Sequence, residues 1–124
     1  TYSGAVVYNS DVTYNKALQG NTNTDTTNAG SVTLDFDTYQ NFVLTFTDNV
    51  TFANPSTEAV GQSGFIVIIQ DSTGGRTLSL GTDFETESGV SVTLSSAASA
   101  TDVIPYIVIA SNRILLGTPL LAFS

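Results

Sequence analysis

Three carboxylates at alternating positions form the first group in the sequence that could do chemistry. Asp83, Glu85 and Glu87 are two residues apart, so on a strand all three side chains would lie on one face. Oxygen ligands of this kind bind Ca²⁺, but a cation site also needs converging backbone carbonyls, and the spacing of an EF-hand loop is absent. The alternative is a solvated loop that keeps an edge strand from pairing wrongly. We favour the solvated loop and expect no metal or other cofactor, while a cation at these residues stays open.

A second pair of carboxylates, Asp35 and Asp37, could serve as the acid and the base or nucleophile of a glycosidase. The two residues occupy alternate positions at a strand end, and the chain has no Trp to stack against a sugar. The chain also has no His and no Cys, which removes the usual zinc ligands and the Ser-His and Cys-His dyads. We therefore expect that the chain is not an enzyme.

The charge balance argues against nucleic acid and membrane partners. The net charge is −8, and the three basic residues, Lys16, Arg76 and Arg113, are far apart in the sequence, whereas phosphate binding needs clustered basic side chains. An acidic surface also repels anionic membranes, and no apolar run approaches the roughly 18 residues of a spanning helix. Charged residues make up only 11% of the chain, against about 25% in an ordinary soluble domain. A surface covered with hydroxyl groups instead suits a protein whose surface is taken up by neighbours.

The elements that position these side chains are short strands, and no segment has the apolar spacing of a helix. Apolar and hydroxylated residues alternate in three segments, 31–36, 42–47 and 90–95, which is typical of half-buried antiparallel strands. Turn residues predict hairpins at 48–49, 71–75 and 111–112. The predicted fold class is all-β, an antiparallel β-sandwich or jelly-roll-like barrel in a single domain.

Two strands break the alternation because both of their faces are apolar. They are 65–69 and 103–109, and the C-terminal segment 114–123 adds further apolar side chains. A large exposed apolar surface is rare on a monomer, so the pattern predicts self-association. The alternative is a monomer whose core is tightly packed. The residues that we assign to self-contact are Ile104, Tyr106, Val108, Leu121 and Phe123.

The first thirty residues differ in character from the rest. We divide the chain into an N-terminal extended arm with a polar loop, 1–30, and a β-sandwich domain, 31–124. The arm contains a short strand-like run at 5–8, and its low-complexity stretch 21–28 is predicted to be a loop. Such an arm can add to the sheet edge of a neighbour, and an ordinary first strand of the same sheet is an equal alternative. The residues of the arm that we assign to contact with a partner are Tyr2, Val6, Val7 and Tyr8.

From Asn41 onward the sequence resembles a β-module that recurs in virion proteins of tailed phages. The resemblance lies in NFVLTF at 41–46, NVTFANP at 49–55, GQSGFIVIIQD at 61–71 and GGRTL at 74–78. The module occurs at the ends of tail-fibre-like proteins and in small capsid decoration proteins, and it implies a trimeric, β-rich piece without catalytic residues. The acidic loop GTDFETE at 81–87 replaces the Trp- and Gly-rich loop of the fibre-associated version, which weakens a receptor-binding interpretation.

Together these features predict a structural virion protein. Our main hypothesis is a capsid decoration, or cement, protein that binds the major capsid protein on the outer capsid surface as a homo-oligomer, with a trimer implied by the resemblance. In this hypothesis the arm residues Tyr2, Val6, Val7 and Tyr8 contact the capsid. Burial of apolar area can supply the adhesion without any chemistry. The alternative hypothesis is a head-fibre or tail-fibre tip module that binds a host receptor.

Overall fold

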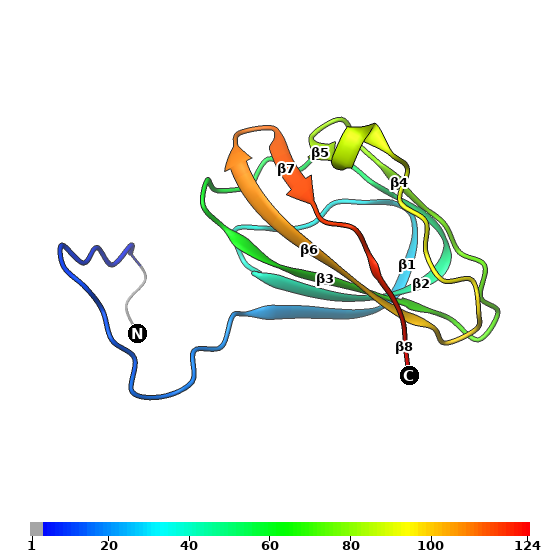
Figure 1. The fold of residues 1–124 in the computed structure, drawn as a ribbon, viewed down its shortest axis with the longest axis horizontal. Helices are drawn as coiled ribbons and strands as arrows, with labels where there is room; N and C mark the ends of the chain where they lie inside the picture. Colours follow the sequence, from blue (N-terminus) through cyan, green and yellow to red (C-terminus); the bar gives the residue numbers. More distant parts are fainter. Residues whose placement is uncertain (1–3) are drawn as a thin grey trace.

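The structure, a computed structural model, describes residues 4–124. From residue 22 onward the strands form one curled sheet, a half-barrel (Figure 1). Within these residues the chain has eight strands, a single turn of 3₁₀ helix and no α-helix. The elements are β1 (Thr22–Val32), β2 (Asn41–Phe52), β3 (Ser63–Gln70), β4 (Leu78–Leu80), β5 (Phe84–Glu85), η1 (Glu87–Gly89), β6 (Thr101–Ala110), β7 (Arg113–Leu116) and β8 (Leu120–Phe123).

The strand order is β1-β2-β3-β6-β7-β5, with β4 paired to β2 and β8 paired to β6 outside this path. Strands β3, β7 and β8 pair with β6 in antiparallel fashion, whereas the pairs β1–β2, β2–β3, β2–β4 and β5–β7 are parallel. The predicted all-β, barrel-like fold in one small domain is confirmed. The sheet is mixed, however, and not antiparallel throughout.

The structure confirms one of the three predicted hairpins and corrects the other two. The turn at 111–112 joins the antiparallel strands β6 and β7, as predicted. The residues at 48–49 instead continue strand β2, because the residues beyond them pair with β1 on one side and β4 on the other. The Asn49 side chain accepts a hydrogen bond from the Thr77 backbone N–H. The turn at 71–75 does not return the chain along β3 but leads to β4, which pairs with β2. Asp71 closes this turn by accepting hydrogen bonds from Thr73 N, Gly74 N and the Arg76 guanidinium.

Two further segments differ from the sequence prediction. The stretch 21–28, predicted as a loop, lies largely in strand β1, which also crosses the predicted boundary at residue 30. Its pairing is stabilised by the buried Asn28, whose Nδ2 donates to Thr45 O at 3.0 Å and to Asp25 O at 3.1 Å. The segment 90–95, predicted as a strand, has no regular strand pairing, although Val92 and Leu94 still pack against the core.

The core lies on the concave side of the sheet and is rich in aromatic rings. Phe42 is fully buried, and its ring meets that of Phe36 edge-on with centroids 5.2 Å apart. Tyr106 also contacts Phe36, with centroids 5.3 Å apart. Burying a side chain of this size stabilises the fold by about 1.5–3 kcal/mol. The fully buried apolar side chains include Phe42, Phe46, Phe52, Leu34, Leu44, Ile66, Ile68, Ile104, Ile114, Val50 and Val108.

Candidate functional site

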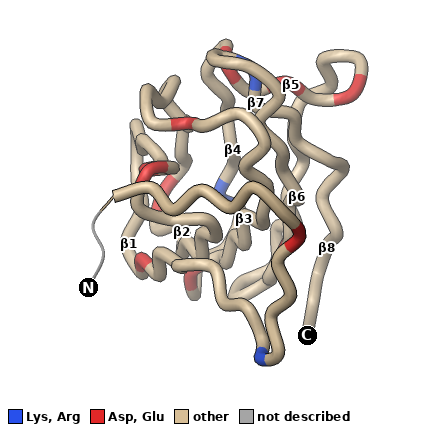
Figure 2. Tube along the Cα trace, turned by 90° about the vertical axis from the view of Figure 1, so that its left-hand side faces the viewer, with Lys and Arg blue, Asp and Glu red and all other residues tan. Residues whose placement is uncertain are grey.

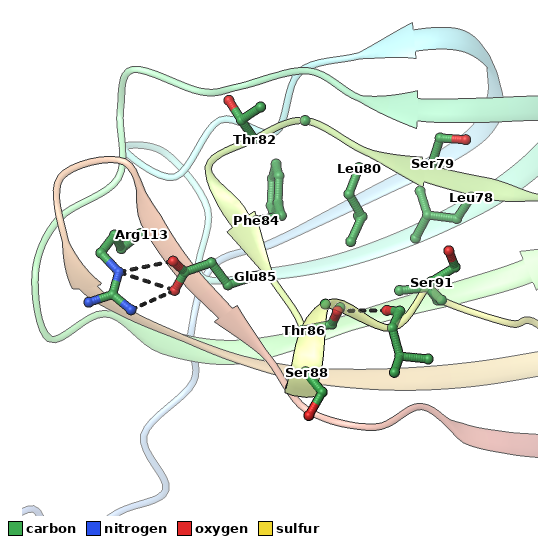
Figure 3. A pocket seen from close by; sticks show the side chains of 14 residues that line it. Leu78, Ser79, Leu80, Thr82, Phe84, Glu85, Thr86, Ser88, Ser91 and Arg113 are labelled. Carbon is green, nitrogen blue, oxygen red and sulfur yellow. Dashed lines mark hydrogen bonds and ion pairs between the residues drawn. The ribbon is translucent and has the colours of Figure 1, made fainter.

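The main candidate site is an open hollow of about 810 Å³ between β4, β5, η1 and the segment that follows η1 (Figure 3). Its base is formed by the apolar side chains of Leu78, Leu80 and Phe84. Hydroxyl groups and one ion pair lie around this base (Figure 3). This volume is within the range of small-molecule sites, about 300–1,000 Å³, which usually combine an apolar lining with a few placed polar groups.

A tight turn at 81–83 brings β5 to the hollow. Gly81 N donates to Phe52 O at 2.7 Å, and a Cβ atom at Gly81 would lie 2.3 Å from the Asn54 side-chain oxygen, so only glycine fits. The Asn54 amide holds the rest of the turn by accepting from Asp83 N at 2.9 Å and donating to Thr82 Oγ1 at 2.8 Å. The turn therefore fixes where the next residues, Phe84 and Glu85, point.

The polar wall of the hollow is the ion pair between Glu85 of β5 and Arg113 of β7 (Figure 3). Arg113 Nε and Nη2 donate to the two carboxylate oxygens at 2.8–3.1 Å, which is a bidentate arrangement. The hydrogen bond from Arg113 lowers the pKa of Glu85, and the same bond raises the pKa of Arg113. Both side chains remain accessible to a ligand, with exposed fractions of 39% and 53%. The pair is thus a charged, preformed hydrogen-bonding group at the rim.

The segment after β5 completes the wall. Thr86 Oγ1 donates to Val90 O at 2.6 Å and closes the loop over η1. Ser88, at a positive φ of 54°, and Ser91 add hydroxyl groups (Figure 3). A second hollow of about 410 Å³ lies across the same segment, toward Leu121. The first hollow thus combines apolar side chains, several hydroxyl groups and one ion pair in its lining.

The acidic trio from the sequence does not converge on a cation. Strand β5 ends at Glu85, so the alternation stops there; Asp83 is buried, Glu85 pairs with Arg113 and Glu87 lies in η1. Residues 4–124 contain no cluster of three or more acidic, His or Cys side chains suited to a metal. Asp35 also has a local task, since it accepts hydrogen bonds from Asp37 N and Thr38 N in a turn. Its hydrogen bonds with Thr38 lower its pKa.

The residues predicted to contact the capsid lie on an exposed segment, so far as they are described. Val6, Val7 and Tyr8 are all exposed and lie before the first strand, on the segment that projects from the sheet (Figure 1). Tyr2 lies outside the described residues. The structure therefore gathers three of these residues on one accessible segment, and their binding to a capsid stays a prediction.

The residues predicted for self-contact fall into two groups. Ile104, Tyr106 and Val108 are buried in the core of their own chain, so their side chains offer no surface to a second copy. Leu121 and Phe123 are exposed on β8. Side chains alternate across a strand. The exposed large apolar residues in the predicted stretch of β6 are Ile107 and Ile109, which lie on the opposite face from Ile104, Tyr106 and Val108. The self-contact assignment in β6 therefore selected the wrong face, and self-association itself stays a prediction.

Two site residues were missed by the sequence reasoning. Arg113 was noted only as one of three basic residues, and Asn54 only as part of a turn motif. Their partners, Glu85 and Asp83, are distant in the sequence, so no local pattern indicates the contacts. With only three basic residues and eleven acidic ones in the chain, a carboxylate partner for Arg113 could have been expected, but the sequence does not indicate which one.

Comparison with known families matches residues 5–109 to the family described as "Putative phage tail fibre C-terminal domain". The chain belongs to this family of phage tail fibre C-terminal domains. The matched region includes β1 to β5 and nearly all of β6, as well as most of the hollow. Membership makes the fibre domain a structural component of a phage virion, as the sequence resemblance implied. Searches of curated proteins and of solved structures found no match. No helix in the described part of this fibre domain is long and apolar enough to cross a membrane.

Proposed function

We propose that this tail fibre domain is a receptor-binding module that holds a host-surface carbohydrate in the hollow between β4, β5 and η1. The observation that supports the proposal is the accessible Glu85–Arg113 pair beside an apolar base and a hydroxylated wall. The tail-fibre alternative from the sequence analysis thus has more support than the capsid hypothesis, because the family match concerns a tail fibre domain.

The chemistry of the hollow suits the hydroxyl groups of a sugar. A guanidinium has five N–H donors, and the bidentate pair uses those of Nε and Nη2 that face Glu85, which leaves donors on Arg113 for a ligand. The carboxylate of Glu85 still has lone pairs that can accept from sugar hydroxyl groups. Leu78 and Phe84 are only 6% exposed, so the accessible apolar surface for the carbon-rich face of a ring comes from Leu80, Val90 and Val92.

The charge of the chain favours a neutral sugar over an anionic one. The net charge is −8, and the one guanidinium that lines the hollow is already paired with Glu85. An acidic saccharide would therefore meet repulsion from the protein without a free cation to offset it. We further propose that the domain binds without catalysis, which is consistent with a sequence that has no His and no Cys.

A test of this proposal is the binding of surface polysaccharide from the bacterial strain that the phage infects, measured by calorimetry or biolayer interferometry. We expect the R113A variant to lose at least about tenfold in affinity, since a charge-assisted hydrogen bond is worth about 1.5–3 kcal/mol. The matched control is K16A, which changes the net charge equally at an exposed site outside the hollow. Equal binding by R113A and wild type would contradict the site, and no binding by wild type would contradict the function.

Capsid decoration is a second candidate function, favoured by the exposed apolar residues Val6, Val7 and Tyr8 at the N-terminal end. In this case the chain binds the major capsid protein on the outer capsid surface as a trimer. Counting the copies of the protein in purified virions by quantitative mass spectrometry separates the two functions. Hundreds of copies support decoration, and about a dozen or fewer support a fibre.

A further inference from the structure

The second hollow, of about 410 Å³, has no role in the function proposed above. One of its walls is the segment 86–93, which we name the strap, and the other is the chain that leads from β7 into β8. Its volume is within the range of about 300–1,000 Å³ that is usual for small-molecule sites. The residues that line it outside the strap are Leu116, Gly117, Thr118, Pro119 and Leu121.

The strap is a wall that the two hollows share. The residues that line both hollows are Thr86, Ser88, Val90, Ser91 and Val92. A residue that lines both must lie between them, so one width of chain separates the hollows. Ser88, Val90 and Ser91 are exposed, so the strap itself is open to solvent. A chain-like ligand can therefore pass from one hollow to the other across the strap without leaving the protein surface.

The strap is held at both ends and within itself. Strand β5, immediately before it, is fixed by its pairing with β7 and by the ion pair of Glu85. Just after the strap, Ser95 N and Oγ each donate to the buried carboxylate of Asp102 at 2.7 Å. Inside the strap, Thr86 Oγ1 donates to Val90 O at 2.6 Å. The shared wall is thus preformed, which reduces the ordering that a ligand would have to impose.

The lining of the second hollow suits the same kind of ligand as the first. Leu121 and Val90 are 52% and 65% exposed and offer apolar surface, and Thr93 and Thr118 are exposed hydroxyl residues. Among the described residues that line this hollow, Glu87 is the one charged side chain, and its carboxylate can accept hydrogen bonds from hydroxyl groups. In Figure 2 the trace at β8, on the far wall, carries no charged residue. An anionic group would therefore meet a carboxylate without a cation to offset it.

We propose that the second hollow is a further carbohydrate subsite, so that the domain recognises a linear neutral oligosaccharide and not a single sugar unit. One unit lies in the hollow at Glu85 and Arg113, and a following unit of the same chain crosses the strap into the second hollow. This inference rests on the proposed receptor function. Once the first unit is bound, contact of the next unit becomes intramolecular, so the second hollow increases the affinity for longer chains.

The test is NMR titration of the isotope-labelled domain with the constituent monosaccharides of the host polysaccharide and with its oligosaccharides of increasing length. We expect wild type to bind the longer oligosaccharides at least about tenfold more tightly than the monosaccharides. The amide signals of Gly117 and Leu121 should shift with the oligosaccharides only, whereas that of Arg113 should shift with both kinds of ligand.

Two tryptophan variants test the second hollow directly. T118W fills this hollow from an exposed residue that does not line the first hollow. It should bind the monosaccharides like wild type but lose most of the gain in affinity with chain length. The control T24W makes the same substitution at an exposed residue of β1 that lines neither hollow, and it should keep the gain. Far-UV circular dichroism establishes that each variant is folded.

Three results would overturn the second subsite. They are an affinity of wild type that does not rise with chain length, a T118W variant that keeps the gain, and oligosaccharide binding that leaves the signals of Gly117 and Leu121 unchanged. If R113A still weakens the binding of every ligand in these cases, the receptor proposal stands without the second subsite. A wild-type domain that binds none of the ligands would contradict the receptor proposal itself, and the second subsite with it.

Discussion

Replacing Asp102 by alanine should destabilise the fold more than any other single change at a polar residue that we consider. Asp102 is only 2% exposed, and its carboxylate accepts three hydrogen bonds. Ser95 N and Ser95 Oγ each donate at 2.7 Å, and Ala122 N donates at 2.9 Å. The carboxylate thus connects β6 to β8 and to the segment 90–95, whose residue Val92 lines the hollow.

The magnitude follows from the donors that the D102A variant would leave without a partner. Water can reach Ala122, which is exposed, but Ser95 is partly buried, and its two donors lose bonds to a charged acceptor. An unsatisfied buried donor costs about 1–3 kcal/mol, so we expect a loss of about 3 kcal/mol in the free energy of unfolding. The S95A variant removes only the hydroxyl bond and should cost about 1 kcal/mol.

Urea unfolding at pH 7, followed by far-UV circular dichroism, measures both values. The double variant S95A/D102A should cost less than the sum of the two single changes, because the residues interact directly. A loss below about 1 kcal/mol for D102A would refute the reasoning, since it would mean that water or a rearranged loop satisfies the Ser95 donors.

Three further predictions concern other parts of the fold. F42A removes a fully buried ring and should lower the free energy of unfolding by about 3–5 kcal/mol in urea titration. G74A should lower the free energy of unfolding by about 1–3 kcal/mol more than G75A does. Both glycines have a positive φ, so the backbone strain is similar in the two variants. A Cβ atom at Gly74 would lie 2.5 Å from Ser96 O, whereas a Cβ atom at Gly75 would meet open space. Arg113 holds the pKa of Glu85 below its usual 4.5, and Arg76 holds that of Asp71 below 3.8. These pairs therefore stabilise the fold fully at higher pH and less as the pH falls through the lowered pKa values. At pH values below about 4.5 the melting temperature of wild type should decrease, and the decrease should be smaller in the E85Q variant.

The parts of the fold that were predictable from the sequence are those where polar and apolar residues alternate. In 42–46 the apolar residues Phe42, Leu44 and Phe46 are buried, as the pattern indicates. In 103–109 nearly every residue is apolar, so no polar residue marks the exposed face. For this reason the self-contact assignment named Ile104, Tyr106 and Val108, which are buried in their own chain. Side-chain direction in this stretch depends on the register with the partners of β6.

Long-range pairing accounts for the remaining differences. The Asn- and Thr-rich stretch within β1 has weak local preferences, and its parallel pairing with β2 makes it a strand. The hollow likewise depends on contacts between distant residues, such as Glu85 with Arg113 and Asn54 with Thr82. A sequence pattern indicates which residues are acidic or basic, but it does not show which of them meet after folding.

The central claim, that this tail fibre domain recognises the host through the hollow at Arg113, is tested most directly by competition in phage adsorption. Purified domain is mixed with cells of the susceptible strain before the phage is added, and the rate at which free phage disappears is measured. We predict that wild-type protein and K16A slow adsorption in a concentration-dependent way, while R113A does so at least about tenfold less effectively. Adsorption that is unchanged at saturating wild-type protein, or slowed equally by R113A, would contradict the claim.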